Sequence, residues 1–282
     1  MSQKSYDNKP TLYLIPTPIG NMEDITIRSI NKLKEVDVVF SEDTRETLKL
    51  LNYLGISKKL ISCHKFNEDK AYLKVIEYLN NGLNVGLVTD RGTPIISDPG
   101  YVSAYNVIKE GYNVVGLPGP TAFVPALITS AINPNKFLFF GFLDSKKSQK
   151  KKQLQELKNL KYTIIFYESP FRIKETIELI NDIMGERKIS ISREISKKYE
   201  EIYRGTPKSV LQELPDPKGE FVIVVEGNNS EENYDDIDVI SHVKMLIEDG
   251  ISEKEAIKTV AKLHKLSKND VYMMVKGVRI WN

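Results

Sequence analysis

The sequence contains little of the chemistry that several common protein classes require. Its 282 residues include a single cysteine, Cys63, which excludes an internal disulfide and is typical of a protein from a reducing compartment. The three histidines, His64, His242 and His264, are spread along the chain without the spacing of a ligand cluster. The sequence therefore predicts no zinc site and no other metal centre.

Long apolar runs are also absent. No segment approaches the ~20 apolar residues that span a bilayer, and the polar start, Met1 to Pro10, lacks the hydrophobic stretch of a secretory signal. We therefore expect a cytoplasmic protein with no membrane partner. The net charge is only +2, so an argument for a nucleic-acid partner has to rest on local patches of charge.

Two nucleotide-binding fingerprints are missing as well. The first apolar run ends in the loop Pro16 to Asn21, which has one glycine where the nicotinamide fingerprint G-x-G-x-x-G has three. The phosphate-binding pattern G-x-x-x-x-G-K-[ST] does not occur either. Glu42 and Asp43 follow the second apolar run, so a nicotinamide oxidoreductase stays open as a weaker alternative.

What the sequence does have is four short loops rich in glycine and proline, each near the end of an apolar run. They are Pro16 to Asn21, Asp90 to Pro94, Ser97 to Gly100 and Pro118 to Ala122. Ligands of open α/β sheets bind outside the carboxyl ends of the strands, where loops of small residues let backbone groups approach a small molecule. One such loop is typical of an ordinary turn. Four of them predict a cofactor cleft lined by backbone.

The first half of the chain alternates short apolar runs with segments of helical periodicity. The runs that we expect to form strands are Leu12 to Pro16, Val36 to Phe40, Leu60 to Cys63, Val85 to Thr89 and Val114 to Leu117. Buried strands that alternate with helices predict a mostly parallel sheet with helices on both faces. We assign this α/β domain to residues 11–122.

The second half carries its strands closer together, with fewer helices between them. The expected strands are Phe137 to Phe142, Tyr162 to Tyr167, Ile189 to Arg193, Glu200 to Arg204 and Phe221 to Val225. This crowding favours a mixed sheet, which we assign to residues 123–227. The predicted fold class is thus α/β, with two α/β domains and the cofactor cleft between them.

The remaining segments read differently. We expect residues 1–10 to be a disordered N-terminus, and residues 228–238, which are acidic and rich in asparagine, to be a linker. Residues 239–282 predict a small helical C-terminal module of three helices, with Ser252 and Ser267 as the caps of the second and third.

Six motifs carry a resemblance to a known family. They are LIPTPIGNMEDI (Leu14 to Ile25), SEDTR (Ser41 to Arg45), VTDRGTPIISDPG (Val88 to Gly100), LPGPTA (Leu117 to Ala122), FYESPFRI (Phe166 to Ile173) and SREISK (Ser192 to Lys197). In this order they closely resemble the tetrapyrrole-methylase-like group of methyltransferases dependent on S-adenosylmethionine. Within that group, the resemblance is to the bacterial enzymes that methylate the ribose 2′-oxygen of a cytidine in small-subunit (16S) ribosomal RNA.

The resemblance implies that S-adenosylmethionine folds into the cleft and that the protein is a homodimer. The cofactor residues that it implies are Pro16, Thr17, Pro18, Gly20, Gly92, Thr93, Pro94, Ile96, Thr121, Ala122, Tyr167 and Arg193. Two positions near the cleft depart from the family's usual pattern: Arg91 stands where alanine is usual, and Phe171 stands where histidine is usual.

The chemistry of a sulfonium cofactor needs little acid catalysis, because the leaving group departs neutral; the enzyme must above all align the nucleophile with the methyl carbon. For proton removal and orientation we consider Asp43, Arg45, Glu168 and Lys197. Asp43 and Arg45 are favoured for orientation, and Lys197 for a base or a phosphate contact.

A run of cations beside the cleft indicates the RNA-binding surface. Its members are Lys146, Lys147, Lys150, Lys151 and Lys152, together with Arg172. Clustered cations of this kind bind phosphates, although a charge run is also typical of a plain solvated face. The alternatives to ribosomal RNA methylation are methylation of a tetrapyrrole or another small molecule and, in a different class, a noncatalytic RNA-binding protein.

Overall fold

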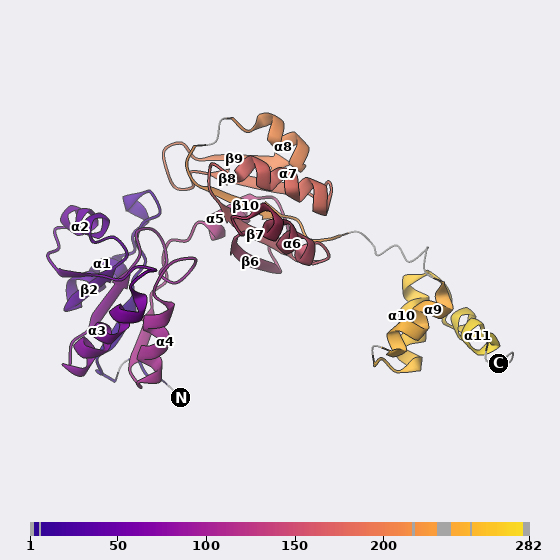
Figure 1. Cartoon of the computed structure of the whole chain (residues 1–282), viewed down its shortest axis with the longest axis horizontal. Coiled ribbons are helices and arrows are strands. Elements are labelled where there is room, and N and C mark those ends of the chain that lie inside the picture. The colour runs from indigo at the N-terminus through magenta and orange to yellow at the C-terminus, as the bar shows by residue number, and fades with distance from the viewer. Residues whose placement is uncertain (1–2, 6, 216–217, 230–237, 249, 279–282) are drawn as a thin grey trace. The chain divides into compact units, whose positions relative to one another are not determined.

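The computed structural model describes residues 3–5, 7–215, 218–229, 238–248 and 250–278. The chain divides into two compact units, Met1–Asn228 and Asn229–Asn282. Among the described residues, the first unit holds two five-stranded sheets and the second holds three helices (Figure 1).

The first sheet is wholly parallel. Its strands are β1 (Thr11–Leu14), β2 (Val38–Ser41), β3 (Lys59–Ser62), β4 (Val85–Val88) and β5 (Asn113–Gly116), in the order β3-β2-β4-β1-β5. This confirms the predicted parallel sheet. Because all five strands run the same way, the loops that follow them meet at one edge of the sheet.

Helices cover both faces of this sheet. On one face, α3 (Glu68–Asn80) and α4 (Tyr101–Lys109) contribute Val75 and Val107 to a core with Phe40. On the other face, α1 (Ile27–Glu35) and α2 (Thr44–Tyr53) contribute Leu33 and Leu51. A short 3-10 helix, η1 (Met22–Asp24), precedes α1.

The second sheet is mixed, as predicted. Its strands are β6 (Phe137–Phe142), β7 (Thr163–Glu168), β8 (Ile189–Arg193), β9 (Glu201–Gly205) and β10 (Phe221–Val225), in the order β6-β7-β10-β8-β9. Only β6 and β7 pair in parallel, and the other pairs are antiparallel.

Side chains of β7 alternate between the two faces of this sheet. Ile164 and Phe166 pack toward α6 (Lys147–Leu157), α7 (Ile173–Met184) and α8 (Pro207–Glu213). Ile165 and Tyr167 pack toward α5 (Phe123–Thr129). The sequence patterns did not predict α5 and α8, which are short; α8 begins with a proline inside a capping box of Thr206 and Ser209.

The C-terminal unit consists of α9 (Val239–Glu248), α10 (Glu253–Leu263) and α11 (Lys268–Val278) around a small apolar core. The side chains of Ser252 and Ser267 accept backbone hydrogen bonds from Glu255 and Asp270, so both predicted caps are confirmed. No helix within the described ranges is long and apolar enough to cross a membrane.

The start of the chain differs from the predicted disorder. The Gln3 side chain exchanges two hydrogen bonds with the backbone of Val114, at 2.8 and 2.9 Å, and Asn113 donates to Asp7 at 2.8 Å. These bonds hold the described part of the start against the edge strand β5. Most of the proposed linker, residues 228–238, lies outside the described residues.

Candidate functional site: a cavity lined by both sheets

Loops at the carboxyl edge of the first sheet are hydrogen-bonded into one wall. Thr17 and Gly92 exchange two backbone hydrogen bonds, of 2.9 and 3.1 Å. The Thr17 hydroxyl donates to the carbonyl of Thr89 at 3.1 Å, and the Thr93 hydroxyl donates to the carbonyl of Pro120 at 2.9 Å. Three of the four predicted loops are therefore fixed to one another by hydrogen bonds within the protein.

The backbone of this wall adopts conformations that few side chains tolerate. Gly92 has φ +85°, and a Cβ there would lie 3.3 Å from Ile19 Cγ2. Ile95 and Ser97, in the same loop, have φ of +76° and +67° although neither is glycine. Strained non-glycine residues of this kind concentrate at functional sites.

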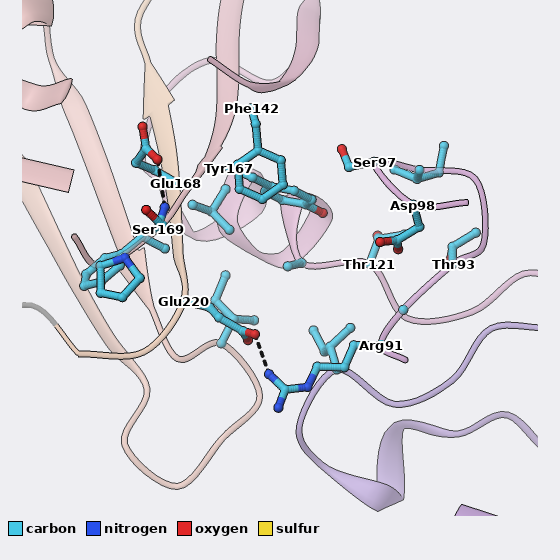
Figure 2. A pocket seen from close by; sticks show the side chains of 18 residues that line it. Arg91, Thr93, Ser97, Asp98, Thr121, Phe142, Tyr167, Glu168, Ser169 and Glu220 are labelled. Carbon is cyan, nitrogen blue, oxygen red and sulfur yellow. Dashed lines mark hydrogen bonds and ion pairs between the residues drawn. The ribbon is translucent and has the colours of Figure 1, made fainter. Parts of the chain in front are cut away.

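A cavity of about 310 Å³ opens where these loops face the second sheet (Figure 2). The loops of the first sheet, up to the N-cap of α5, contribute Ile19, Arg91, Gly92, Thr93, Ile96, Ser97, Asp98, Thr121 and Ala122. The second sheet and its loops contribute Phe142, Tyr167, Glu168, Ser169, Pro170, Ile195, Glu220, Phe221 and Val222. A mostly apolar cavity with a few convergent polar groups is typical of a site for a small molecule.

Two aromatic rings form part of the second sheet's side of the cavity. The rings of Phe142 and Tyr167 lie 5.6 Å apart in an edge-to-face arrangement, and Phe139 packs against Tyr167 at 4.9 Å. Burial raises the pKa of Tyr167 to about 12, so its phenol stays neutral at physiological pH. The pair offers an aromatic, uncharged surface.

A chain of ion pairs joins the two sides of the cavity. Arg91, after β4, pairs with Glu220, before β10 (Figure 2). The other oxygen of Glu220 accepts a hydrogen bond from Lys197 at 2.8 Å, and Lys197 also pairs with Glu194 at 2.8 Å. The stem of Lys197 lies so close to Gly20 that a Cβ on that glycine would clash with it.

Glu168, which we considered as a catalytic group, is held by its neighbours. Oε1 accepts a hydrogen bond from the Ser169 N–H at 2.8 Å and lies 3.1 Å from Arg172 Nε. Oε2 accepts a hydrogen bond from the Thr176 hydroxyl at 2.7 Å, and the side chain is 1% exposed. The structure thus gives Glu168 the task of fixing the turn between β7 and α7, because its oxygens are already bonded inside the protein.

Lys150 contradicts the predicted RNA contact. Its side chain is fully buried, and Nζ donates to Glu175 Oε2 and to Thr176 Oγ1, both at 3.0 Å. The physical reason is helical periodicity: Lys150 lies four residues before Leu154 and shares its buried face of α6. The same spacing, read in the sequence, would have indicated the burial.

Arg172 also has an internal role. One nitrogen of its guanidinium donates to the carbonyls of Leu143 and Asp144, at 2.6 and 3.1 Å, which fixes the loop after β6. The other predicted cations, Lys146, Lys147, Lys151 and Lys152, are exposed.

Asp43 and Arg45 lie at the start of α2, outside the cavity wall. Asp43 caps the helix by accepting the Arg45 N–H at 2.8 Å, and the Arg45 side chain adds three hydrogen bonds. These bonds hold the pKa of Asp43 well below its usual range. Asp90 accepts the Asp43 N–H at 2.9 Å and so connects this helix start to the loop after β4.

Six of the predicted cofactor residues line the cavity: Gly92, Thr93, Ile96, Thr121, Ala122 and Tyr167. The other six, Pro16, Thr17, Pro18, Gly20, Pro94 and Arg193, do not. Thr17 lies behind Gly92 and supports it. Arg193 turns away because it pairs with Glu201 at 2.8 Å and donates to the Lys218 carbonyl at 2.8 Å.

Most of the residues that the sequence reasoning missed come from the second sheet. Phe221 and Val222 start an ordinary buried strand, so no glycine or proline distinguishes them. Ser97 and Asp98 could have been predicted to line the cavity, because they belong to one of the four loops noted above. Asp98 is an unusual group: burial, and then the neighbouring charges of Glu42 and Asp90, raise its pKa to about 7.

A parallel sheet followed by a mixed sheet, with a cavity lined from both, defines a class of α/β protein. Three solved structures share the fold over 77% of this chain: uroporphyrin-III-C-methyltransferase from Thermus thermophilus (TM-score 0.54, 16% identity), cobalt precorrin-4 methyltransferase (0.57, 18%) and diphthine synthase (0.59, 13%). The match covers 94%, 94% and 90% of those chains.

The chain belongs to the Tetrapyrrole (Corrin/Porphyrin) Methylases, whose family profile matches residues 11–211. It is also similar, over 96% of its length, to proteins named ribosomal RNA small subunit methyltransferase I. The identity is 44% for the protein of Bacillus subtilis, 43% for that of Halalkalibacterium halodurans and 38% for that of Streptococcus pyogenes serotype M1. These matches cover 96%, 97% and 97% of the relatives.

Proposed function

We propose that the protein is an S-adenosylmethionine-dependent methyltransferase that methylates the ribose 2′-oxygen of a cytidine in small-subunit ribosomal RNA. The observation that carries the proposal is the extent of the match to relatives. The proteins named ribosomal RNA methyltransferases match 96% of this chain, whereas the tetrapyrrole and diphthine enzymes match 77%. This difference favours an RNA substrate over a tetrapyrrole.

The cavity supports the proposed cofactor. Phe142 and Tyr167 offer aromatic surface to an adenine ring, since aromatic side chains stack well on bases. Gly92 leaves space on the opposite side, and the hydroxyls of Thr93 and Thr121 are available near the polar end of an amino acid. Bound here, S-adenosylmethionine would supply an electrophilic methyl group and leave as a neutral thioether.

The protein's part in the reaction is then orientation. The ribose oxygen has to meet the methyl carbon in line, at roughly 3 to 3.5 Å, and its proton has to leave as the new bond forms. We assign Asp43 and Arg45 to orientation of the nucleotide. For Lys197, whose ammonium group lies between two carboxylates, the arrangement favours a phosphate contact over a base.

The proposed RNA contacts come from the exposed lysines of α6 and from Lys146, which precedes this helix. Lys146, Lys147, Lys151 and Lys152 are exposed, and the loop that leads to them follows β6, whose last residue, Phe142, lines the cavity. We further propose that the ribosomal RNA is methylated within the small subunit and that the protein acts in the cytoplasm. The resemblance implies that it does so as a homodimer.

Titration calorimetry with S-adenosylmethionine, S-adenosylhomocysteine and a nicotinamide dinucleotide tests the cofactor. We expect the first two to bind and the third not to bind. Transfer of a labelled methyl group to small subunits, to naked ribosomal RNA and to a tetrapyrrole then tests the substrate, with mass spectrometry to locate a 2′-O-methylcytidine. Methylation of the tetrapyrrole alone would overturn the proposal.

Single-turnover rates with saturating cofactor and RNA test the residue roles. We expect Asp43→Asn and Lys197→Met to slow the methyl-transfer step more than tenfold, because both residues are proposed to hold the substrate in place. A slowing of less than about threefold, under ~1 kcal/mol on the barrier, would contradict these roles. Glu168→Gln serves as the comparison, because its expected effect is on folding and not on the chemical step.

A further inference from the structure

The cavity wall contains one carboxylate whose charge is not balanced. Four charged residues line the cavity: Arg91, Asp98, Glu168 and Glu220. Arg91 and Glu220 pair with each other, and Glu168 lies against Arg172. Asp98 has no ion-pair partner among the residues that the structure describes.

The groups that face Asp98 increase this imbalance. Glu42, in the loop after β2, and Asp90, after β4, carry the same charge, and Tyr167 on the far wall is a neutral phenol. Burial is the main reason why the pKa of Asp98 is raised to about 7, and these two acids raise it further. A ligand with a positive charge near Asp98 would relieve the imbalance.

We propose that Asp98 determines the specificity of this cavity for the charge on sulfur, so that the sulfonium cofactor binds in preference to its thioether product. The inference rests on the proposed function. S-adenosylmethionine and S-adenosylhomocysteine share the adenosine and the amino acid and differ by one methyl group and one positive charge. A half-buried, unpaired carboxylate stabilises the sulfonium of the cofactor and gives no such stabilisation to the neutral thioether of the product.

The first test compares the two ligands in Asp98→Asn, which keeps the shape and removes the charge. We expect the affinity for S-adenosylmethionine to fall about tenfold or more, and that for S-adenosylhomocysteine to change less than about threefold, because only the first carries the sulfonium charge that Asp98 is proposed to attract. Glu42→Gln is the matched control, since it makes the same chemical change outside the cavity wall.

The second test uses the unchanged protein and needs no mutant to fold. A cation favours the ionised form of Asp98, so binding of S-adenosylmethionine should weaken as the pH falls below about 7, by up to tenfold per unit, and level off above it. Binding of S-adenosylhomocysteine should stay nearly flat. Glu42→Gln should move the inflection to lower pH, because it removes one of the like charges that raise the pKa of Asp98.

Calorimetry across pH 5.5 to 8.5 (roughly one and a half pH units on either side of the expected inflection) distinguishes the outcomes. An equal loss of both ligands in Asp98→Asn would assign Asp98 to the amino group that they share and overturn the inference. Parallel pH profiles for the two ligands in the unchanged protein would overturn it as well. If the unchanged protein bound neither ligand, the proposed function itself would fail, which is a different result.

Discussion

The two sides of the cavity differ in the groups that form them, which are mainly backbone on one side and side chains on the other. On the side of the first sheet, glycine, proline and threonine residues bring backbone groups to the surface, and hydrogen bonds such as those between Thr17 and Gly92 fix them. On the side of the second sheet, side chains form the surface. Aromatic rings face the cavity, and a group of buried charges around Glu168 fixes the turn behind these rings.

The difference teaches where each side is vulnerable. A backbone wall tolerates changes of side chain but not the loss of a glycine, because a Cβ fills the space or strains the chain. A wall held by buried charges is sensitive to the removal of one partner, because the other stays buried without compensation. The expected effects of mutation follow from this contrast.

We expect the largest effect behind the second sheet's wall. Lys150→Met should lower the free energy of unfolding by about 3 kcal/mol, because it removes the fully buried cation that pairs with Glu175 and lies 3.9 Å from the buried Glu168. Lys147 and Arg172 still pair with these two carboxylates, which holds the loss at the lower end for a broken buried ion pair. Lys151→Met, next along α6 but exposed, is the matched control and should cost less than about 0.5 kcal/mol. Urea unfolding followed by circular dichroism measures both. Equal losses would mean that the buried charges do not hold this wall.

The first sheet's wall should respond at Gly92. Gly92→Leu should weaken cofactor binding about a hundredfold or more, because the new side chain meets Ile19 and the carbonyl of Pro120 and fills the cavity. Gly111→Leu is the control: its φ of +84° imposes a similar backbone strain, but nothing lies within 4 Å of the added Cβ. Undiminished binding by Gly92→Leu in calorimetry would refute the cavity as the cofactor site.

The exposed lysines test whether the second sheet's side also holds RNA. Replacement of Lys146, Lys151 and Lys152 by glutamine should flatten the slope of log affinity against log salt by about two units, since each lost phosphate contact removes roughly 0.7 to 0.9. The cofactor affinity should hardly change. The same replacement at Lys34, Lys74 and Lys109, which are exposed in the first domain, should leave the slope as it is. Equal slopes in both triple mutants would make the lysine run a plain solvated face.

The smallest effect should come from the ion pair that joins the two sides. Arg91 and Glu220 are 56% and 58% exposed, and the double-mutant cycle with Arg91→Gln and Glu220→Gln should give a coupling below about 1 kcal/mol. Glu220→Gln alone should cost more than Arg91→Gln, because Glu220 also pairs with Lys197. A coupling above about 2 kcal/mol in unfolding experiments would contradict the expectation that this exposed ion pair contributes little to stability.

Much of the fold followed from local pattern. The parallel and mixed sheets were predicted because short apolar runs alternate with helical periodicity in one half and crowd together in the other. The short helices α5 and α8 were missed, since seven residues give too little periodicity to recognise.

The site was predicted best where its signal is local. Gly92 and Thr93 were found because a loop that exposes backbone needs small residues, whatever lies opposite. The burial of Lys150 and the bonds of Glu168 were not anticipated, although the spacing of Lys150 and Leu154 contained part of the answer.

The sequence by itself determined the order of strands and helices, the loops at the strand ends and the family to which the chain belongs, because these depend on neighbouring residues and on motifs. Only the tertiary structure decided which charges are compensated. Lys150 and Lys151 are adjacent in sequence, yet one lies buried between α6 and α7 and the other lies in solvent. Asp98 is a plain carboxylate in the sequence, and its unbalanced charge arises because folding brings it near Glu42 and Asp90 and takes it out of water.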